Sequence, residues 1–155
     1  MIFRKYWYFF AYNTVGGISV LSVENAKSIM KNGDYMCVLY KDETVYASRQ
    51  NGLKLLTYAV GKNLDLQGFS AVDSLVGKAS ALLYAYHGVK SVCCESLSEN
   101  AIPVFVWNKM MFDAENILTE KPDGIDDFTV NAEYMTVNVG DPDELAEDFL
   151  KIIKK

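Results

Sequence analysis

Cysteine, histidine and proline are scarce in this chain of 155 residues. The three cysteines, Cys37, Cys93 and Cys94, are an odd number, so the sequence implies no disulfide framework and favours the reduced thiols of a cytoplasmic protein. His87 is the one histidine and there is no Cys-x-x-Cys pair, so a tetrahedral zinc site would lack its usual ligands at the usual spacing. We therefore expect no metal and no other cofactor.

Long apolar runs are also missing. The aromatic stretch 6–12 follows Arg4 and Lys5 as the core of a signal peptide would. However, Asn13 and the residues after it interrupt the stretch well short of the roughly 20 residues that a membrane span requires. We expect no membrane association, and we interpret residues 1–21 as a β-prone aromatic arm that packs on the domain or on another subunit.

Positive charge is in deficit, with a formal net charge of -5 at pH 7. Nucleic-acid binding depends on Lys and Arg side chains that neutralise phosphates, so we expect no nucleic-acid partner. The deficit is uneven: residues 1–112 hold 11 Lys and Arg against 8 Asp and Glu, whereas residues 113–155 hold 4 against 12. A small anionic ligand is thus compatible with the first two thirds, and the last third is a solvated or cation-attracting surface.

What the chain does have is the composition of a globular protein, with 50% hydrophobic and 23% charged residues. Its length fits one domain, which we place at 22–155 after the arm. Apolar periodicity and turn residues predict an α/β protein. The predicted helices are 22–32, capped by Ser22 and ended by Gly33, then 53–61, 70–88, 96–107 and 142–153; the predicted strands are 35–40, 44–48, 89–94, 110–112 and 134–139; a helical turn is predicted at 114–118 and a loop at 119–128.

The helix predicted from Ser70 carries the candidate site. Ser70 and Asp73 have the spacing of a capping box, and apolar residues recur at helical spacing from there to the stop signal Gly88. Lys78 lies within about two turns of Asp73, so a ligand at this helix end could meet both. The alternative is that Asp73 only caps the helix and Lys78 is solvated. Gly77-Lys78 is not part of a phosphate-binding loop, because that motif needs a glycine where Val72 stands.

The remaining reactive side chains have simpler interpretations. His87 is expected at the surface, in the last turn of that helix, where the dipole favours an imidazolium. The cysteines are expected to pack within strands, with adjacent Cys93 and Cys94 on opposite faces. A reactive Cys93 or Cys94 just before the helix predicted near Ser96 stays open, because a helix N-terminus lowers the pKa of a thiol.

Residues 70–83, Ser-Ala-Val-Asp-Ser-Leu-Val-Gly-Lys-Ala-Ser-Ala-Leu-Leu, resemble the signature of a bacterial family known as domain of unknown function 1893. Segments 37–42, 88–92 and 98–101 resemble its pattern in the same order, so that the likeness covers about 22–118. The resemblance implies a three-layer αβα, cytidine-deaminase-like fold with a central mixed sheet that opens with a β-hairpin. Deaminases hold zinc at the starts of their second and third core helices.

The stretches that correspond in this chain are 70–73 and 95–98, and neither holds a thiol or an imidazole, so a zinc-activated water is not supported. The family's Cys-Pro-x-Glu element is replaced by Asn131-Ala132-Glu133, in which only Glu133 persists.

Three functions remain open. The first is a zinc-free domain that binds a small metabolite, such as a nucleotide or nucleoside, at the N-terminus of the second core helix. Its candidate ligand-binding residues are Ser70, Asp73, Lys78, Glu95 and Ser98. The second is a metal-independent hydrolase or transferase with Asp73 as base and Cys93 or Cys94 as nucleophile. The third is an oligomerisation or scaffold module that uses the arm and Trp7. A homodimer is expected.

Overall fold

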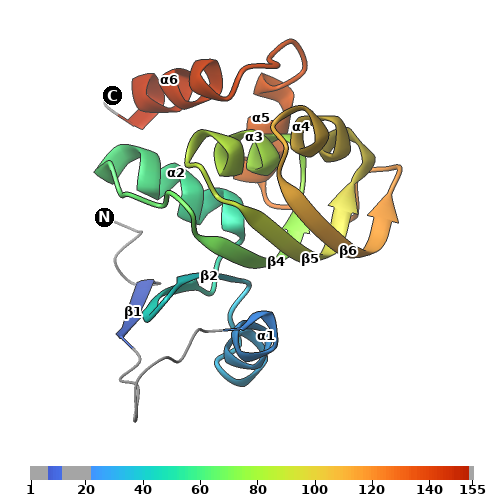
Figure 1. Cartoon of the computed structure of the whole chain (residues 1–155). Helices are drawn as coiled ribbons and strands as arrows, with labels where there is room; N and C mark the ends of the chain where they lie inside the picture. The colour runs from blue at the N-terminus through green and yellow to red at the C-terminus, as the bar shows by residue number, and fades with distance from the viewer. Residues whose placement is uncertain (1–6, 12–21, 154–155) are drawn as a thin grey trace.

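The computed structural model describes residues 22–153 and the backbone of residues 7–11 (Figure 1). One sheet runs in the order β1-β3-β2-β4-β5-β6. Its first three strands are antiparallel to their neighbours, and β4, β5 and β6 are parallel. The strands are β1 Trp7–Ala11, β2 Cys37–Lys41, β3 Thr44–Ser48, β4 Ser70–Val76, β5 Ser91–Ser98 and β6 Met111–Leu118.

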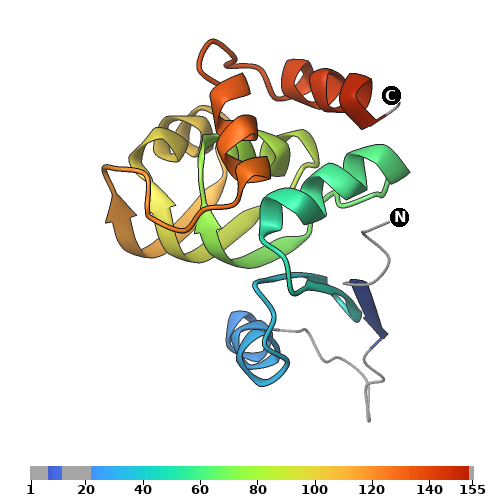
Figure 2. The same ribbon diagram turned by 180° about the vertical axis from the view of Figure 1, so that it is seen from behind.

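Helices lie on both faces of this sheet, so the predicted three-layer α/β architecture with a mixed sheet and a β-hairpin, here β2–β3, is confirmed. Helix α1 packs on one face, and the other helices lie on the opposite side (Figures 1 and 2). The helices are α1 Val23–Asn32, α2 Gly52–Lys62, α3 Lys78–Tyr86, α4 Ile102–Trp107, α5 Asp127–Met135 and α6 Pro142–Ile153, and a 3-10 turn, Glu99–Ala101, precedes α4.

Two apolar clusters fill the space between these layers. The larger one joins the sheet to α2, α3, α4 and α6, with Leu55, Leu82, Leu97 and Phe105 fully buried. The smaller one lies between α1 and the β2–β3 hairpin. Because helices cover the central strands on both sides, those strands are apolar on both faces.

The helix predicted from Ser70 to Gly88 is wrong in its first half. Ser70–Val76 is the central strand β4, and the helix begins only at Lys78, with Gly77 in an extended conformation as its N-cap. A strand that is buried on both faces is a continuous apolar run, and periodicity alone does not separate such a run from a buried helix. The capping box at Ser70 and Asp73 does not form, because both residues lie within the strand.

Three other expectations are also wrong. The helical turn predicted at 114–118 belongs to β6, and the edge strand predicted at 134–139 is the end of α5 followed by a turn. His87 is not at the surface: it is only 8% exposed, and its Nε2 lies 3.1 Å from the carbonyl oxygen of Leu56. Burial holds the pKa of His87 below its ordinary value.

The structure describes little of the arm predicted at residues 1–21. The backbone of Trp7–Ala11 forms strand β1, which adds to the sheet antiparallel to β3. The rest of the arm lies outside the described residues. Within the described part of the chain, no helix has both the length and the apolar character needed to span a membrane.

Candidate functional site

A cavity of about 390 Å³ opens at the carboxyl ends of the parallel strands. Ligands of open α/β sheets bind at this end, where strands stop and helices begin. The lining comes from the ends of β4, β5 and β6, the 3-10 turn before α4, the loop after β6 and the starts of α2 and α3, and α5 covers the cavity. The apolar lining residues are Leu53, Leu75, Leu118, Pro122, Ile125, Val130 and Val137.

The carboxylate of Glu133, from α5, is bound to the start of α3. Its Oε1 accepts a hydrogen bond of 3.1 Å from the backbone N–H of Ala79. Gly77 makes this approach possible, because a Cβ at that position would lie only 2.1 Å from Glu133 Oε1. The carboxylate therefore compensates the positive end of a helix whose own N-cap residue has no side chain. Burial raises the pKa of Glu133, against the opposing effect of the N–H groups of Ala79 and Lys78.

Ser80 supplies a second polar group at the same helix end. Ser80 is only 3% exposed, and it lines the cavity one turn after Gly77. Its hydroxyl has no hydrogen-bond partner among the described residues. Because this hydroxyl belongs to the cavity lining and is bonded to no other described group, it is available to a ligand in the cavity.

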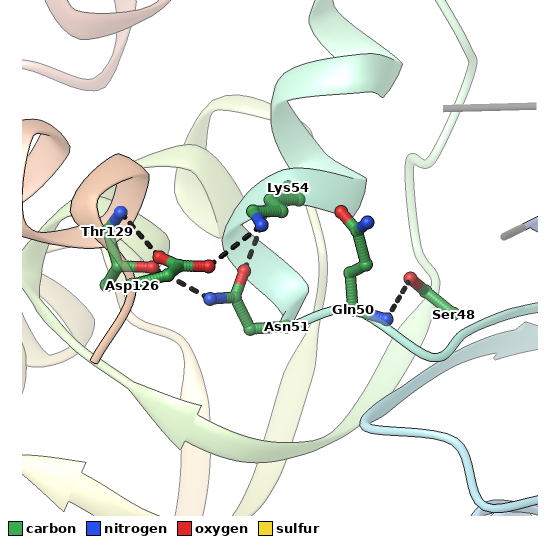
Figure 3. A network of polar contacts seen from close by, with 6 residues as sticks. All are labelled: Ser48, Gln50, Asn51, Lys54, Asp126 and Thr129. Carbon is green, nitrogen blue, oxygen red and sulfur yellow. Dashed lines mark hydrogen bonds and ion pairs between the residues drawn. The ribbon is translucent and has the colours of Figure 1, made fainter. Parts of the chain in front are cut away.

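A network of polar contacts fixes α5 against α2 (Figure 3). Asn51, the N-cap of α2, donates from Nδ2 to Thr129 Oγ1 over 2.8 Å. Asp126, the N-cap of α5, accepts from the N–H of Thr129 and forms a 2.8 Å ion pair with Lys54. Partial burial opposes the charged form of Asp126, but these bonds hold its pKa below the ordinary value. The network positions the α5 residues that close the cavity.

A second hollow of about 520 Å³ adjoins the cavity, and five residues line both: Asn51, Leu75, Leu118, Pro122 and Ile125. Lys54 and Asp126 lie along its wall. Ser74 also lines it, and the buried hydroxyl oxygen of Ser74 has no hydrogen-bond partner among the residues that the structure describes. A ligand that fills the first cavity therefore has polar space beside it.

Asp73, the candidate base, is enclosed in the core instead of lining this cavity. It is 0% exposed, and its two oxygens accept from Tyr84 Oη over 2.7 Å and from the N–H of Ser74 over 2.8 Å. Gly52 lies against it, since a Cβ there would be 2.0 Å from Asp73 Oδ2. Burial raises the pKa of Asp73 to about 6, while these hydrogen bonds act in the opposite direction.

The predicted binding residues lie in several places. Asp73 and Glu95 line a separate hollow of about 410 Å³ on the α1 side of the sheet, together with Cys93 and Cys94. Ser70 stands at the opposite end of β4, where its Oγ accepts a 2.9 Å bond from Ser91. Lys78 donates from Nζ to the carbonyl oxygen of Thr136 over 2.7 Å. Glu95 is exposed in the middle of β5. Only Ser98 of the five lines the cavity, so the single cleft predicted for them does not form.

The cysteines lie away from the cavity. As predicted, Cys93 and Cys94 point to opposite faces of β5: Cys94 packs in the larger cluster and Cys93 packs toward α1. Burial, with the charge of Asp73 as a smaller cause, raises the pKa of Cys94 to about 12. Burial also raises the pKa of Cys37, whose sulfur lies 3.5 Å from Tyr84 Oη. A raised pKa leaves these two thiols in the protonated form, which is the weaker nucleophile.

The stretches compared with the zinc-binding helix starts also need correction. Residues 70–73 and 95–98 lie within strands, while the helices that follow the hairpin and β4 begin at Gly52 and Lys78. Neither of these helix starts supplies a thiol or an imidazole. Within the described ranges, no group of three or more His, Cys, Asp or Glu side chains is arranged to hold a metal ion.

Four residues of the site were not predicted from local sequence: Asn51, Ser80, Thr129 and Glu133. Asn51 before Gly52 carries a signal, because asparagine is a favoured N-cap. Glu133 was singled out only through the family resemblance. Ser80 and Thr129 have no signal of their own, because a serine or threonine in a helix is usually a surface residue.

Comparison with known proteins supports the fold. The crystal structure of a DUF1893 family protein from Thermotoga maritima superposes with a TM-score of 0.69 at 18% identity, over 92% of this chain and 95% of that one. A diaminohydroxyphosphoribosylaminopyrimidine deaminase/5-amino-6-(5-phosphoribosylamino)uracil reductase from the same organism gives a TM-score of 0.38 at 16% identity, over 84% of this chain and 40% of that one. No curated protein matches. The family model described as Domain of unknown function (DUF1893) matches residues 25–120, and the chain belongs to that family.

Proposed function

We propose that this domain binds a small organic metabolite of nucleobase or nucleoside size in the cavity at the ends of β4, β5 and β6. The observation that carries the proposal is the unpartnered hydroxyl of Ser80, which lines the cavity beside apolar residues such as Leu53 and Leu75. An apolar cavity with a few convergent polar groups is the usual form of a small-molecule site.

The size and lining of the cavity suggest the kind of ligand. Its volume of about 390 Å³ is at the lower end of the roughly 300–1,000 Å³ that such sites occupy, which fits one ring system. Leu75 and Ile125 offer apolar contact to the faces of a ring, and Asn100 and Thr119 offer hydrogen bonds to its edge. The adjoining hollow leaves space for a polar substituent such as a ribose.

The test is a thermal unfolding screen with purines, pyrimidines, their nucleosides and their nucleotides. A ligand at 100 times its Kd stabilises the folded state by about 2.7 kcal/mol, which for a domain of this size raises Tm by roughly 5–10 °C. Ser80→Leu fills the cavity from its wall, and Thr119→Trp obstructs it from an exposed loop, so both variants should abolish the shift.

Ser28→Leu is the matched control, because Ser28 is exposed on α1, away from the cavity. This variant should keep the full shift. The proposal fails if no compound in the screen changes Tm, or if Ser80→Leu and Thr119→Trp retain the wild-type response.

A further inference from the structure

The charge inside the cavity is negative. Glu133 forms no ion pair within 4.0 Å among the described residues. The ammonium of Lys78, at the start of α3, donates to the carbonyl oxygen of Thr136, and its charge acts on the Glu133 carboxylate without an ion pair. The remaining charged lining residues, Glu120 and Lys121, are exposed neighbours on the loop after β6. The buried carboxylate is therefore balanced mainly by the N-terminus of α3.

Glu133 and Ser80 lie at the same corner of the cavity. The Glu133 carboxylate lies directly against the backbone of Gly77. Gly77 and Ser80 are three residues apart, so they lie on the same face at the start of α3. A carboxylate has about four lone-pair positions, so it can accept further bonds beside that from the N–H of Ala79. The Ser80 hydroxyl can donate or accept.

We propose that Glu133 and Ser80 together recognise an N–H donor group on the ligand, an amine, amidine or guanidinium attached to a ring, and that the same pair excludes anionic ligands. This inference rests on the proposed function, since it names the class of ligand for the same cavity. A cationic N–H group gains a charge-assisted bond to Glu133. A phosphate or carboxylate would be drawn to a free helix N-terminus, but here the position is already occupied by an acid of the chain itself.

Three ring compounds of equal size separate these possibilities: benzamidine, benzamide and benzoate. Isothermal titration calorimetry on the whole chain should show benzamidine binding at least about tenfold more tightly than benzamide, and no measurable binding of benzoate. Purine and 2-aminopurine, which differ by one amino group, should follow the same order. These comparisons use the unaltered protein, so they do not depend on whether a variant folds.

Glu133→Gln then tests the residue. The glutamine retains an oxygen that can accept from Ala79 but has no charge, so benzamidine should bind about tenfold more weakly, whereas benzamide, whose neutral N–H forms no ion pair, should lose less affinity. Glu147→Gln is the matched control, because it removes the same charge from an exposed position on α6 that does not line the cavity. It should change benzamidine affinity by less than about twofold.

The two proposals fail in different ways. Equal affinities for benzamidine and benzamide, both lost in Ser80→Leu, would overturn the charge-assisted recognition of a cationic N–H group and leave the binding cavity intact. Preference for benzoate would also overturn it. Absence of binding by every ring compound, together with a negative nucleoside screen, would remove the cavity as a binding site.

Discussion

Protonation of Asp73 is expected to stabilise the fold, and this prediction can be worked through quantitatively. The carboxyl group is fully buried in the core beside Tyr84, and burial raises its pKa from the ordinary value of 3.8 to about 6. Between these two values the folded chain binds more protons than the unfolded chain does. The free energy of unfolding therefore falls as the pH rises through this window.

The magnitude follows from the two pKa values. A difference of one pKa unit corresponds to 1.36 kcal/mol, so the full change from 3.8 to about 6 corresponds to about 3 kcal/mol. Between about pH 4.5 and pH 7.5 the Asp73 contribution amounts to about 2 kcal/mol. The destabilisation caused by ionised Asp73 reaches its full value above pH 6 and disappears as the pH falls below 3.8.

Urea unfolding measured across this pH range, in the unaltered protein and in Asp73→Asn, isolates the effect. The asparagine oxygen can still accept from Tyr84, but the side chain does not titrate. The difference in the free energy of unfolding between the two proteins should therefore change by about 2 kcal/mol from pH 4.5 to pH 7.5.

Asp113→Asn removes an exposed carboxyl from β6 and is the matched control, which should keep the slope that Asp73 causes. Parallel curves for the unaltered protein and Asp73→Asn would refute the reasoning, because they would show that the buried carboxyl does not titrate in this window.

Two further predictions concern the contacts that close the cavity, and both are checked by urea unfolding. Gly77→Ala should destabilise the fold by about 1–2 kcal/mol, because its Cβ displaces the Glu133 carboxylate from the start of α3. Gly140→Ala, where a Cβ meets nothing within 4 Å, should be nearly neutral, and equal effects of the two would contradict this account. Asp126→Ala should cost about 1 kcal/mol through loss of the α5 N-cap, while Asp123→Ala in the same loop should not; a neutral Asp126→Ala would show that the cap is dispensable.

The elements that were predicted correctly carry local signals. Ser22 accepts from the N–H of Asn25 at the start of α1, and Gly33 ends that helix, as the sequence pattern indicated. The β2–β3 hairpin has β-branched and aromatic residues around a polar turn. Helix α6 begins at Pro142 and has acidic residues in its first turn, in agreement with its dipole.

The elements that were missed depend on neighbours that are distant in sequence. Ser70–Val76 is a strand because β2 and β5 pair with it on both sides, which no local pattern shows. Its apolar residues have a spacing that fits a helix equally well. The candidate site was misplaced for the same reason. The helix begins at Lys78 and not at Ser70, so Asp73 lies in the core and not at a helix start.

The sequence by itself determined the α/β class, the caps of α1 and the family, because these depend on composition and on residues within a few positions of one another. Only the tertiary structure decided where the cavity lies and what lines it. Glu133 meets Ala79 across 54 positions of the chain, and Asn51 meets Thr129 across 78. Such contacts arise from the packing of whole helices on the sheet, so no local pattern of residues encodes them.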